Sequence, residues 1–388
     1  MTVCICSDGY PSPGLPYSAF IQVLAREMGR QGHKVFVVAP QSLTNHFFRN
    51  GKLAPRKFKD EVSVNGLTKT IAVYRPYSIT FGEGRLGWLT PKFNRWATER
   101  LIKQEHLEPD FFYAHFWANG YNAERVARKN KKPLFVATGE DKINITDFLS
   151  EKDIFRLNNG VSGVICVSTK NKEESIRRSL TTSDKCVVIP NAYDPNDFHQ
   201  LNRLHERNIH GFPDSSFIVS FCGRFNKRKG AMRVAEAIRL LHDDDIKSIF
   251  IGTPADNEYE QPECDGVLFK GGLPHDQINS YLNCSDVFVL PSLAEGCPNS
   301  VIEAMACGLP IISSDLPFNY DILNNENSIL VNPEDVNAIA SAIKQLKDDE
   351  TQRERLAKNS LDKAKELTIK ERVDKILFFI QKRCNQNV

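Results

Sequence analysis

Long apolar runs are absent from this sequence. No stretch of its 388 residues approaches the ~18–20 consecutive apolar residues that a membrane-spanning helix needs. The first residues, MTVCICSDGYP, also lack the basic region and apolar core of a secretory signal. There is no low-complexity tract, and 41% hydrophobic with 25% charged residues is typical of globular proteins. We therefore expect a folded protein located in the cytoplasm.

Paired cysteine motifs are absent as well. The ten cysteines are scattered without a CxxC pair, which favours reduced, buried thiols over a disulfide framework or a zinc site. No GxxxxGK[ST] phosphate-binding loop occurs. The run DDD at 243–245 contains the DxD pattern of some metal sites, but its place between a predicted helix and a predicted strand favours a surface turn. The sequence predicts neither a metal nor another cofactor.

The net charge of +2 conceals two halves of opposite sign. Residues 1–190 contain 28 Lys and Arg against 18 Asp and Glu, whereas residues 191–388 contain 22 against 30. A basic first half favours an anionic partner, such as a phosphate-bearing substrate or a phospholipid surface. Because the acidic second half would repel a nucleic acid that covered the whole molecule, no nucleic-acid partner is expected.

Short β-rich runs alternate with helical patterns along the chain. Continuous apolar strands separated by amphipathic helices indicate parallel sheets covered on both faces, as in doubly wound α/β domains. The predicted strands are 2–6, 34–39, 69–74, 133–138, 163–168 and 185–190, followed by 217–223, 247–252, 266–271, 287–292 and 309–314. The predicted helices are 18–31, 92–106, 120–130, 230–242, 275–283, 300–307 and 335–347.

The polar, turn-rich residues 191–216 interrupt this series once. Because 388 residues exceed one core of ordinary size, two domains are expected. We predict an N-terminal Rossmann-like domain at 1–190, a linker at 191–216 and a second Rossmann-like domain at 217–369, facing each other across a cleft. Residues 350–384 form one long helical pattern, and its end, about 370–388, is expected to pack back on the first domain.

The segment EGCPNSVIEAMACGLPIIS, residues 295–313, places Glu295 and Glu303 around a predicted helix start. Ser300 and Glu303 have the spacing of a capping box, which would explain Glu303 as a helix start signal. The segment also follows the strand at 287–292, at the edge where open α/β sheets bind ligands, and a helix start attracts anions. A diphosphate fits there, with Glu303 accepting hydrogen bonds from ribose hydroxyls and Glu295 from those of a second sugar.

A basic loop, GRFNKRKG at 223–230, takes the equivalent position after the strand at 217–223. By itself it is interpreted most simply as a solvated loop before a helix. Beside the two glutamates, Arg224 and Lys229 are better interpreted as groups that meet the same diphosphate and stabilise it as it leaves.

These segments, together with PNAYDPNDF (190–198) and EAMACGLPII (303–312), strongly resemble the retaining glycosyltransferases of family 4. The resemblance spans nearly the whole chain and implies the GT-B fold, with 1–190 as the acceptor-side domain and 217–369 as the donor-binding domain. It implies a metal-independent hexosyltransferase that moves a sugar from a nucleoside diphosphate sugar to a glycan or lipid-linked acceptor, in surface polysaccharide or glycolipid assembly. A GT-B-fold nucleotide-sugar epimerase and a non-catalytic partner subunit that binds sugar nucleotides are the alternatives.

The resemblance also implies roles for individual residues. Arg224 and Lys229 match the pair that neutralises the donor diphosphate, Glu303 matches the ribose ligand, and Glu295 matches the residue at the donor sugar. The donor cradle is completed by Gly296, Cys297, Pro298, Asn299, Ser300 and Val301, and the nucleoside pocket is expected near Thr253, Gly271, Gly272 and Leu273.

The first half carries further matches to the family. HFWANGY (115–121) resembles the segment whose histidine lies near the donor sugar, so His115 is expected to orient the sugar and its phosphate rather than remove a proton. TGEDK (138–142) resembles the next family loop and makes Glu140 and Asp141 acceptor-side candidates. The first loop departs from the family, because YPSPGLPYS (10–18) keeps only Gly14 where paired glycines usually let the backbone approach the phosphate.

Residues 46–59, HFFRNGKLAPRKFK, interleave five basic residues with Phe47, Phe48, Leu53 and Phe58. One interpretation is a mobile loop that covers the core. The other is contact with an anionic membrane surface or a lipid diphosphate acceptor, which would place the protein at the inner face of the membrane. The aromatic stretch 74–96, with Trp88 and Trp96, is an alternative acceptor groove.

Overall fold

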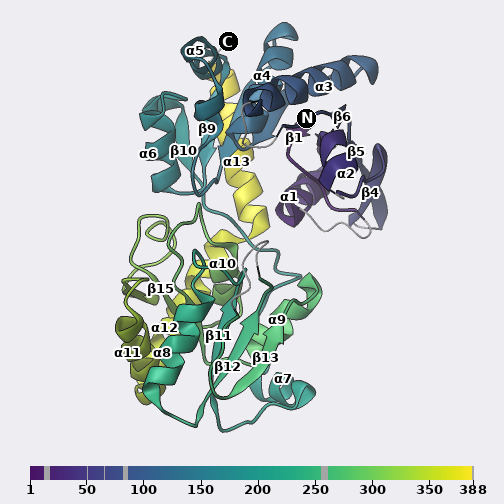
Figure 1. Ribbon diagram of the computed structural model, residues 1–388. Helices are drawn as coiled ribbons and strands as arrows, with labels where there is room; N and C mark the ends of the chain where they lie inside the picture. The colour runs from purple at the N-terminus through teal and green to yellow at the C-terminus, as the bar shows by residue number, and fades with distance from the viewer. Residues whose placement is uncertain (13–17, 50, 65, 82–85, 255–260, 387–388) are drawn as a thin grey trace. The chain divides into compact units, whose positions relative to one another are not determined.

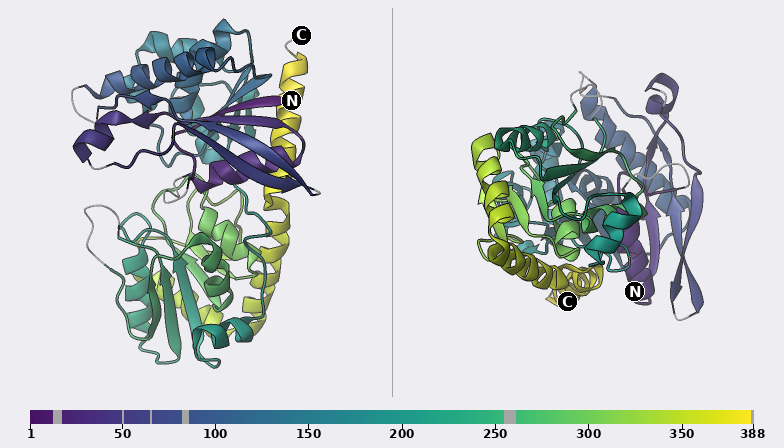
Figure 2. Two further views of the ribbon diagram at one scale, coloured as in Figure 1. Left: turned by 90° about the vertical axis from the view of Figure 1, so that its right-hand side faces the viewer. Right: turned by 90° about the horizontal axis from the view of Figure 1, so that it is seen from below.

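The computed structural model describes residues 1–12, 18–49, 51–64, 66–81, 86–254 and 261–386. The chain divides into two compact units: Met1–Ile189 with Val373–Val388 form unit 1, and Pro190–Arg372 form unit 2. In each unit, helices cover both faces of a sheet (Figures 1 and 2). Among the helices of the described ranges, none is both long and apolar enough to cross a bilayer.

Unit 1 is built on an eight-stranded sheet with the order β10-β9-β8-β7-β1-β2-β5-β4. Neighbouring strands are parallel except β4, which runs antiparallel to β5. The strands are β1 (Thr2–Cys6), β2 (Lys34–Val38), β4 (Lys57–Val64), β5 (Leu67–Tyr74), β7 (Phe111–His115), β8 (Leu134–Thr138), β9 (Gly163–Cys166) and β10 (Cys186–Val188), with a short separate pair, β3 (Gln41–Ser42) and β6 (Tyr77–Ser78).

Strand β4 was not predicted, because its sequence KFKDEVSV carries four charges and lacks a continuous apolar run. Its Asp60 is nevertheless buried, and the carboxylate accepts hydrogen bonds from the Tyr10 hydroxyl at 2.6 Å and from Arg26 at 2.8 Å. The expectation that residues 46–59 form one loop is wrong, since 46–49 end α2 (Leu43–Arg49) and 57–59 begin β4, with 51–56 between them outside helix and strand.

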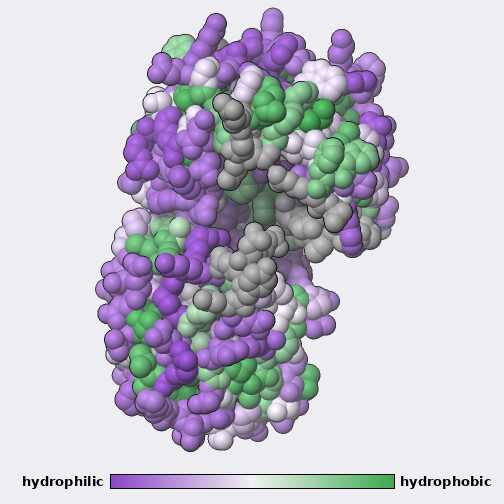
Figure 3. Space-filling model, viewed as in Figure 1, coloured by the Kyte–Doolittle hydropathy of each residue, from purple (hydrophilic) through white to green (hydrophobic). Residues whose placement is uncertain are grey.

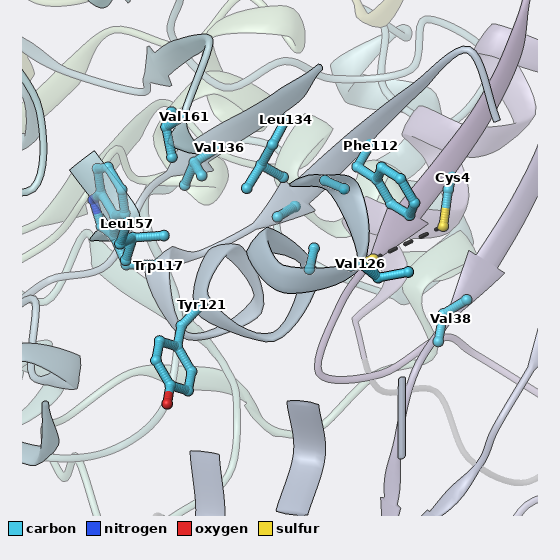
Figure 4. Close-up of a cluster of buried hydrophobic side chains, with 14 of the residues drawn as sticks. Cys4, Val38, Phe112, Trp117, Tyr121, Val126, Leu134, Val136, Leu157 and Val161 are labelled. Atoms are coloured by element: carbon cyan, nitrogen blue, oxygen red, sulfur yellow. Dashed lines mark hydrogen bonds between the residues drawn. The ribbon is translucent and has the colours of Figure 1, made fainter. Parts of the chain in front are cut away.

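The helices of unit 1 pack on the two faces of this sheet. Alternate strand residues, such as Cys4, Phe112 and Val136, meet α4 in a buried cluster that includes Trp117 and Tyr121 (Figure 4). The intervening residues face α13, where the Phe135 and Phe379 rings lie 6.2 Å apart. The helices are α1 (Ala19–Arg30), α2, α3 (Thr90–Gln104), α4 (Trp117–Lys129), α5 (Glu151–Gly160), α6 (Thr169–Arg177) and most of α13 (Ile369–Gln386), with short 3-10 turns η1 (Gly87–Leu89), η2 (Ile145–Phe148) and η3 (Ser183–Lys185).

Unit 2 contains a six-stranded parallel sheet with the order β13-β12-β11-β14-β15-β16. The strands are β11 (Phe217–Cys222), β12 (Ile246–Ile251), β13 (Val267–Gly271), β14 (Val287–Leu290), β15 (Ile311–Ser314) and β16 (Ser328–Val331). The helices are α7 (Arg203–His210), α8 (Ala231–Leu241), α9 (His275–Asn283), α10 (Asn299–Ala306), α11 (Val336–Asp348) and α12 (Glu350–Ala364).

Two predicted segments differ in the structure. Residues 191–216, expected as a linker, belong to unit 2, where the Arg207 guanidinium of α7 is buried and bonds the Asp286 carboxylate at 2.6 Å. The single helix expected at 350–384 is divided into α12 and α13 by η4 (Lys365–Leu367). The break follows from pairing with Tyr193, whose N–H donates to Leu367 and whose carbonyl accepts from Ile369.

Candidate functional site

Two loops at the carboxyl edge of the unit 2 sheet are bound to each other. One follows β11 and the other follows β14, its neighbour in the sheet. The Leu293 N–H donates to the Arg228 carbonyl at 2.8 Å, and the Arg228 guanidinium donates to the Ala294 carbonyl at 2.7 Å. The basic loop and the glutamate loop that the sequence singled out therefore form one surface, at the edge where open α/β sheets bind ligands.

Lys229 and Glu295 form an ion pair at the centre of this surface. The Lys229 Nζ lies 2.5 Å from Glu295 Oε1, and the Arg228 guanidinium lies 3.3 Å from Oε2. The Glu295 side chain is only 10% exposed and that of Lys229 17% exposed. Since both charges are largely removed from water, each is held in place by the other. Arg224, on the same loop, is exposed.

The backbone conformation at position 230 explains why a glycine follows Lys229. It has φ +84°, a conformation that side chains rarely adopt, and a Cβ there would lie 2.9 Å from the Pro291 carbonyl oxygen. The Lys229 N–H is fixed from the other side by the Asn226 side-chain oxygen at 2.8 Å. The close approach of the two loops thus depends on a position without a side chain.

Glu303 lies in α10 and is half-buried. Burial, together with the nearby Asp197 carboxylate, raises the pKa of Glu303 to about 7, and the Lys229 ammonium partly offsets this rise. Near neutral pH this carboxyl group is therefore poised between an acceptor-only carboxylate and a form that also donates a hydrogen bond.

The capping-box interpretation of Glu303 is wrong. Helix α10 begins at Asn299 with Pro298 as its N-cap, so Ser300 lies inside the helix, and within the described residues no side chain caps its start. The preceding loop is held instead by Asn191, whose side-chain amide donates to the Cys297 carbonyl at 3.0 Å and to Asn299 Oδ1 at 2.8 Å. Of the remaining cradle residues, Gly296 and Val301 are buried.

The residues expected at the nucleoside pocket gather beside the basic loop. The Phe225 N–H donates to the Thr253 carbonyl at 2.9 Å, and the Gly252 N–H donates to the Gly271 carbonyl at 2.8 Å. A Cβ on Gly272 would lie 3.0 Å from the Thr253 side chain. Leu273 follows and is half-buried. These residues lie at or just beyond the carboxyl ends of β12 and β13, and β12 is the neighbour of β11 in the sheet.

In unit 1, His115 ends β7 and is 8% exposed. Its ring lies 4.8 Å from that of Phe20 and 4.2 Å from that of Phe116. The His115 carbonyl accepts a hydrogen bond at 2.7 Å from Asn119, whose amide also donates to Asp8 at 2.9 Å. Asp8 was not predicted, although its position just after β1 is the signal that could have found it.

Glu140 lines a cavity of about 430 Å³ in unit 1. Its carboxylate accepts hydrogen bonds from the Trp117 N–H at 2.7 Å, the Thr138 hydroxyl at 2.6 Å and the Gly139 N–H at 2.9 Å, while burial raises its pKa. Asp141 is exposed and accepts from the Lys142 N–H at 2.9 Å. The cavity combines polar with aromatic groups, namely Asp8, Asn94, Asn122, Lys142, Phe81, Phe116 and Phe148. Gly14 lies outside the described residues.

Comparisons with known proteins decide the family. Residues 202–363 match the family described as Glycosyl transferases group 1, and residues 18–197 match Glycosyltransferase Family 4. A Bacillus subtilis protein described as putative teichuronic acid biosynthesis glycosyltransferase TuaC is 30% identical over 353 residues, covering 88% of both chains. The chain belongs to the group 1 glycosyl transferases.

A second curated relative and two solved structures are also similar to this chain. The Escherichia coli UDP-Gal:alpha-D-GlcNAc-diphosphoundecaprenol alpha-1,3-galactosyltransferase is 31% identical over 227 residues, which are 55% of this glycosyltransferase and 58% of that one. The structure of sucrose-phosphate synthase from Thermosynechococcus elongatus covers 100% of both chains with a TM-score of 0.76 and 17% identity. Anabaena HepE in complex with UDP has a TM-score of 0.74 at 17% identity, covering 98% of this chain and 100% of that one. The predicted GT-B fold of two Rossmann-like domains is confirmed.

Proposed function

We propose that this glycosyltransferase takes a hexose from a nucleoside diphosphate sugar and transfers it, with retention of the anomeric configuration as in family 4, to an acceptor hydroxyl. The Lys229–Glu295 ion pair at the carboxyl edge of the unit 2 sheet carries this proposal. It puts a cation for the diphosphate and a carboxylate for sugar hydroxyls within 2.5 Å of each other, and Glu295 belongs to the loop that leads into α10.

In the proposed mechanism, Lys229 and Arg224 neutralise the charge that develops on the leaving diphosphate. Lys229 exchanges Glu295 for a phosphate oxygen when the donor binds, which frees the Glu295 carboxylate to accept hydrogen bonds from the donor sugar. Glu303 holds the ribose hydroxyls, His115 orients the transferred sugar, and the leaving phosphate assists removal of the acceptor proton.

For the acceptor we propose a glycan or a lipid-linked glycan, in surface polysaccharide or glycolipid assembly. The names of the Bacillus and Escherichia relatives support this class. The cavity at Glu140 supports it independently, because carboxylates and amides beside aromatic rings suit the hydroxyls and apolar faces of a sugar.

The donor is tested by calorimetry and thermal shift with UDP-, GDP-, ADP- and dTDP-sugars in the absence of metal. We expect one base to stabilise the protein selectively, and Glu303→Ala to weaken its binding. Nuclear magnetic resonance of the product formed from that donor then determines the anomeric configuration. No binding by any donor would contradict the proposal, whereas an inverted product would overturn retention alone.

A further inference from the structure

One face of α3 carries alternating aromatic and basic side chains. Trp88, in η1 just before the helix, is followed at four-residue intervals by Lys92, Trp96 and Arg100, a spacing that places them on the same side. Trp88 is 45% and Trp96 55% exposed. The Lys92 ammonium lies 4.3 Å from the Trp88 ring centre, and the Arg100 guanidinium 5.2 Å from that of Trp96.

A groove of about 590 Å³ lies beside this stripe. Tyr77, Ile79, Phe93 and Trp96 are among the apolar and aromatic side chains that line it, and its charged lining residues are Arg56 and Arg100. The Arg56 guanidinium lies 5.0 Å from the centre of the Tyr77 ring. Among the described residues that line the groove there is no carboxylate, so its charged lining is cationic.

Helix α2 extends the apolar part of this surface. Leu43, its first residue, lines the groove, and Phe47 and Phe48 are 70% and 83% exposed. Hydrophobic residues gather on this side of unit 1, over α2 and α3 (Figure 3). Exposed rings grouped in this way mark an interaction site, because monomeric proteins rarely leave a large apolar patch in contact with water.

We propose that this surface docks onto a bilayer that contains anionic phospholipids. The surface, called here the aromatic–basic face, comprises Phe47, Phe48, Arg56, Tyr77, Trp88, Lys92, Trp96 and Arg100. Tryptophan and tyrosine rings favour the headgroup level of a bilayer, while lysine and arginine extend toward its phosphates. A second copy in an isologous contact would bring cations against cations, which disfavours a dimer through this face. Docking would bring the protein to the lipid-linked acceptor of the proposed function, and its biological purpose rests on that proposal.

Flotation of the full chain with vesicles tests the docking. We expect at least tenfold stronger partitioning onto phosphatidylcholine vesicles that contain phosphatidylglycerol than onto phosphatidylcholine alone, weakened by added salt. Trp96→Ser with Arg100→Gln should lower partitioning at least tenfold, and Arg100→Gln alone roughly fivefold. Phe48→Ser with Lys92→Gln provides a second variant on α2 and α3, should the first not fold.

The matched control lies on α13, which packs on the opposite face of the unit 1 sheet from α4. Phe378 is 69% exposed, and Lys382 follows it at the same four-residue interval. Phe378→Ser with Lys382→Gln should leave partitioning within about twofold of the unchanged protein.

Donor hydrolysis in solution is measured on the same samples, and every variant should keep this activity. Loss of vesicle binding with intact hydrolysis therefore tests docking separately from the proposed function. Equal binding to both vesicle types, equal loss in the α13 control, or displacement by free glycerol phosphate would overturn docking. A dimer that dissociates in the Trp96 and Arg100 variant, without vesicle binding, would assign the face to a second copy instead and would also overturn it.

Discussion

At the scale of single residues, the charges of the candidate donor site belong to one coupled group. Lys229 contacts Glu295 at 2.5 Å and contributes to the electrostatics of Glu303, whose pKa also responds to Asp197. A change at one of these residues therefore alters the others, so single substitutions do not report separate contributions.

Lys229→Gln and Glu295→Gln should each lower kcat by about 100-fold or more, because each removes a group expected to act on the developing charge or the sugar. Since the two side chains form a pair, the kcat of the double variant should be little lower than that of the less active single variant. Steady-state transfer rates check this, with Lys227→Gln in the same loop as a control. Losses that multiply in the double variant would show that the two residues act independently.

Glu303 predicts a pH dependence of stability. Its pKa of about 7 in the folded protein exceeds the ordinary value of 4.5, so between these values the folded state binds the proton that the unfolded state has released. The contribution of this group to the free energy of unfolding should therefore fall as pH rises from 4.5 through 7, by up to about 3 kcal/mol. Urea unfolding at pH 5 and pH 8 measures the change, which Glu303→Gln should largely abolish.

The same pKa predicts how donor binding responds to pH. Ribose hydroxyls donate to a carboxylate, so donor affinity should increase as pH rises through 7 and Glu303 ionises. Calorimetric titrations between pH 6 and pH 8 check this, with Glu303→Gln expected to bind more weakly and with little pH dependence. An affinity that decreases over this range in the unchanged protein would assign Glu303 another role.

At the scale of elements, the sequence pattern predicted the strands that consist of continuous apolar runs. Strands β1, β11 and β14 were predicted because buried parallel strands are apolar along their length. Strand β4 was missed because an edge strand pairs on one side only and tolerates charges. The break between α12 and α13 depends on Tyr193, which is distant in sequence, and no local pattern reports such a contact.

Gly230 lies in the turn between β11 and α8, and its conformation predicts the effect of a substitution there. Gly230→Ala should destabilise the protein by more than the ~1–2 kcal/mol of a left-handed alanine, because its Cβ would also lie 2.9 Å from the Pro291 carbonyl oxygen. Gly211→Ala is the matched control, since Gly211 has φ +67° with no atom within 4 Å of the added Cβ among the described residues. Urea unfolding compares the two. Equal destabilisation would mean that the two loops can separate without cost.

At the scale of the whole molecule, the sequence singled out the residues of the unit 2 loops more fully than those of the unit 1 cavity. Lys229, Glu295 and Glu303 follow strands in recognisable motifs, whereas Asp8 and Asn122 join the unit 1 cavity from separate elements. Arg228 could not be singled out either, because a basic residue in a solvated loop has the same local signal whether or not it contacts a carboxylate. Sequence motifs do not report contacts between residues that only the tertiary structure brings together.

The topology of unit 2 also bears on metal dependence. Residues 243–245 lie between α8 and β12, at the amino edge of a parallel sheet, whereas Lys229 and Glu295 lie at its carboxyl edge. The Asp243 carboxylate is 2.5 Å from the Lys347 Nζ, and that hydrogen bond lowers the pKa of Asp243.

We propose that the reaction requires no bound metal, because cationic side chains neutralise the diphosphate. Transfer should therefore persist in excess EDTA and in Asp243→Asn with Asp245→Asn, measured as product formed per minute. Loss of transfer in EDTA with recovery on adding Mg²⁺ would contradict this, and loss in the double variant would assign the aspartates a part in it.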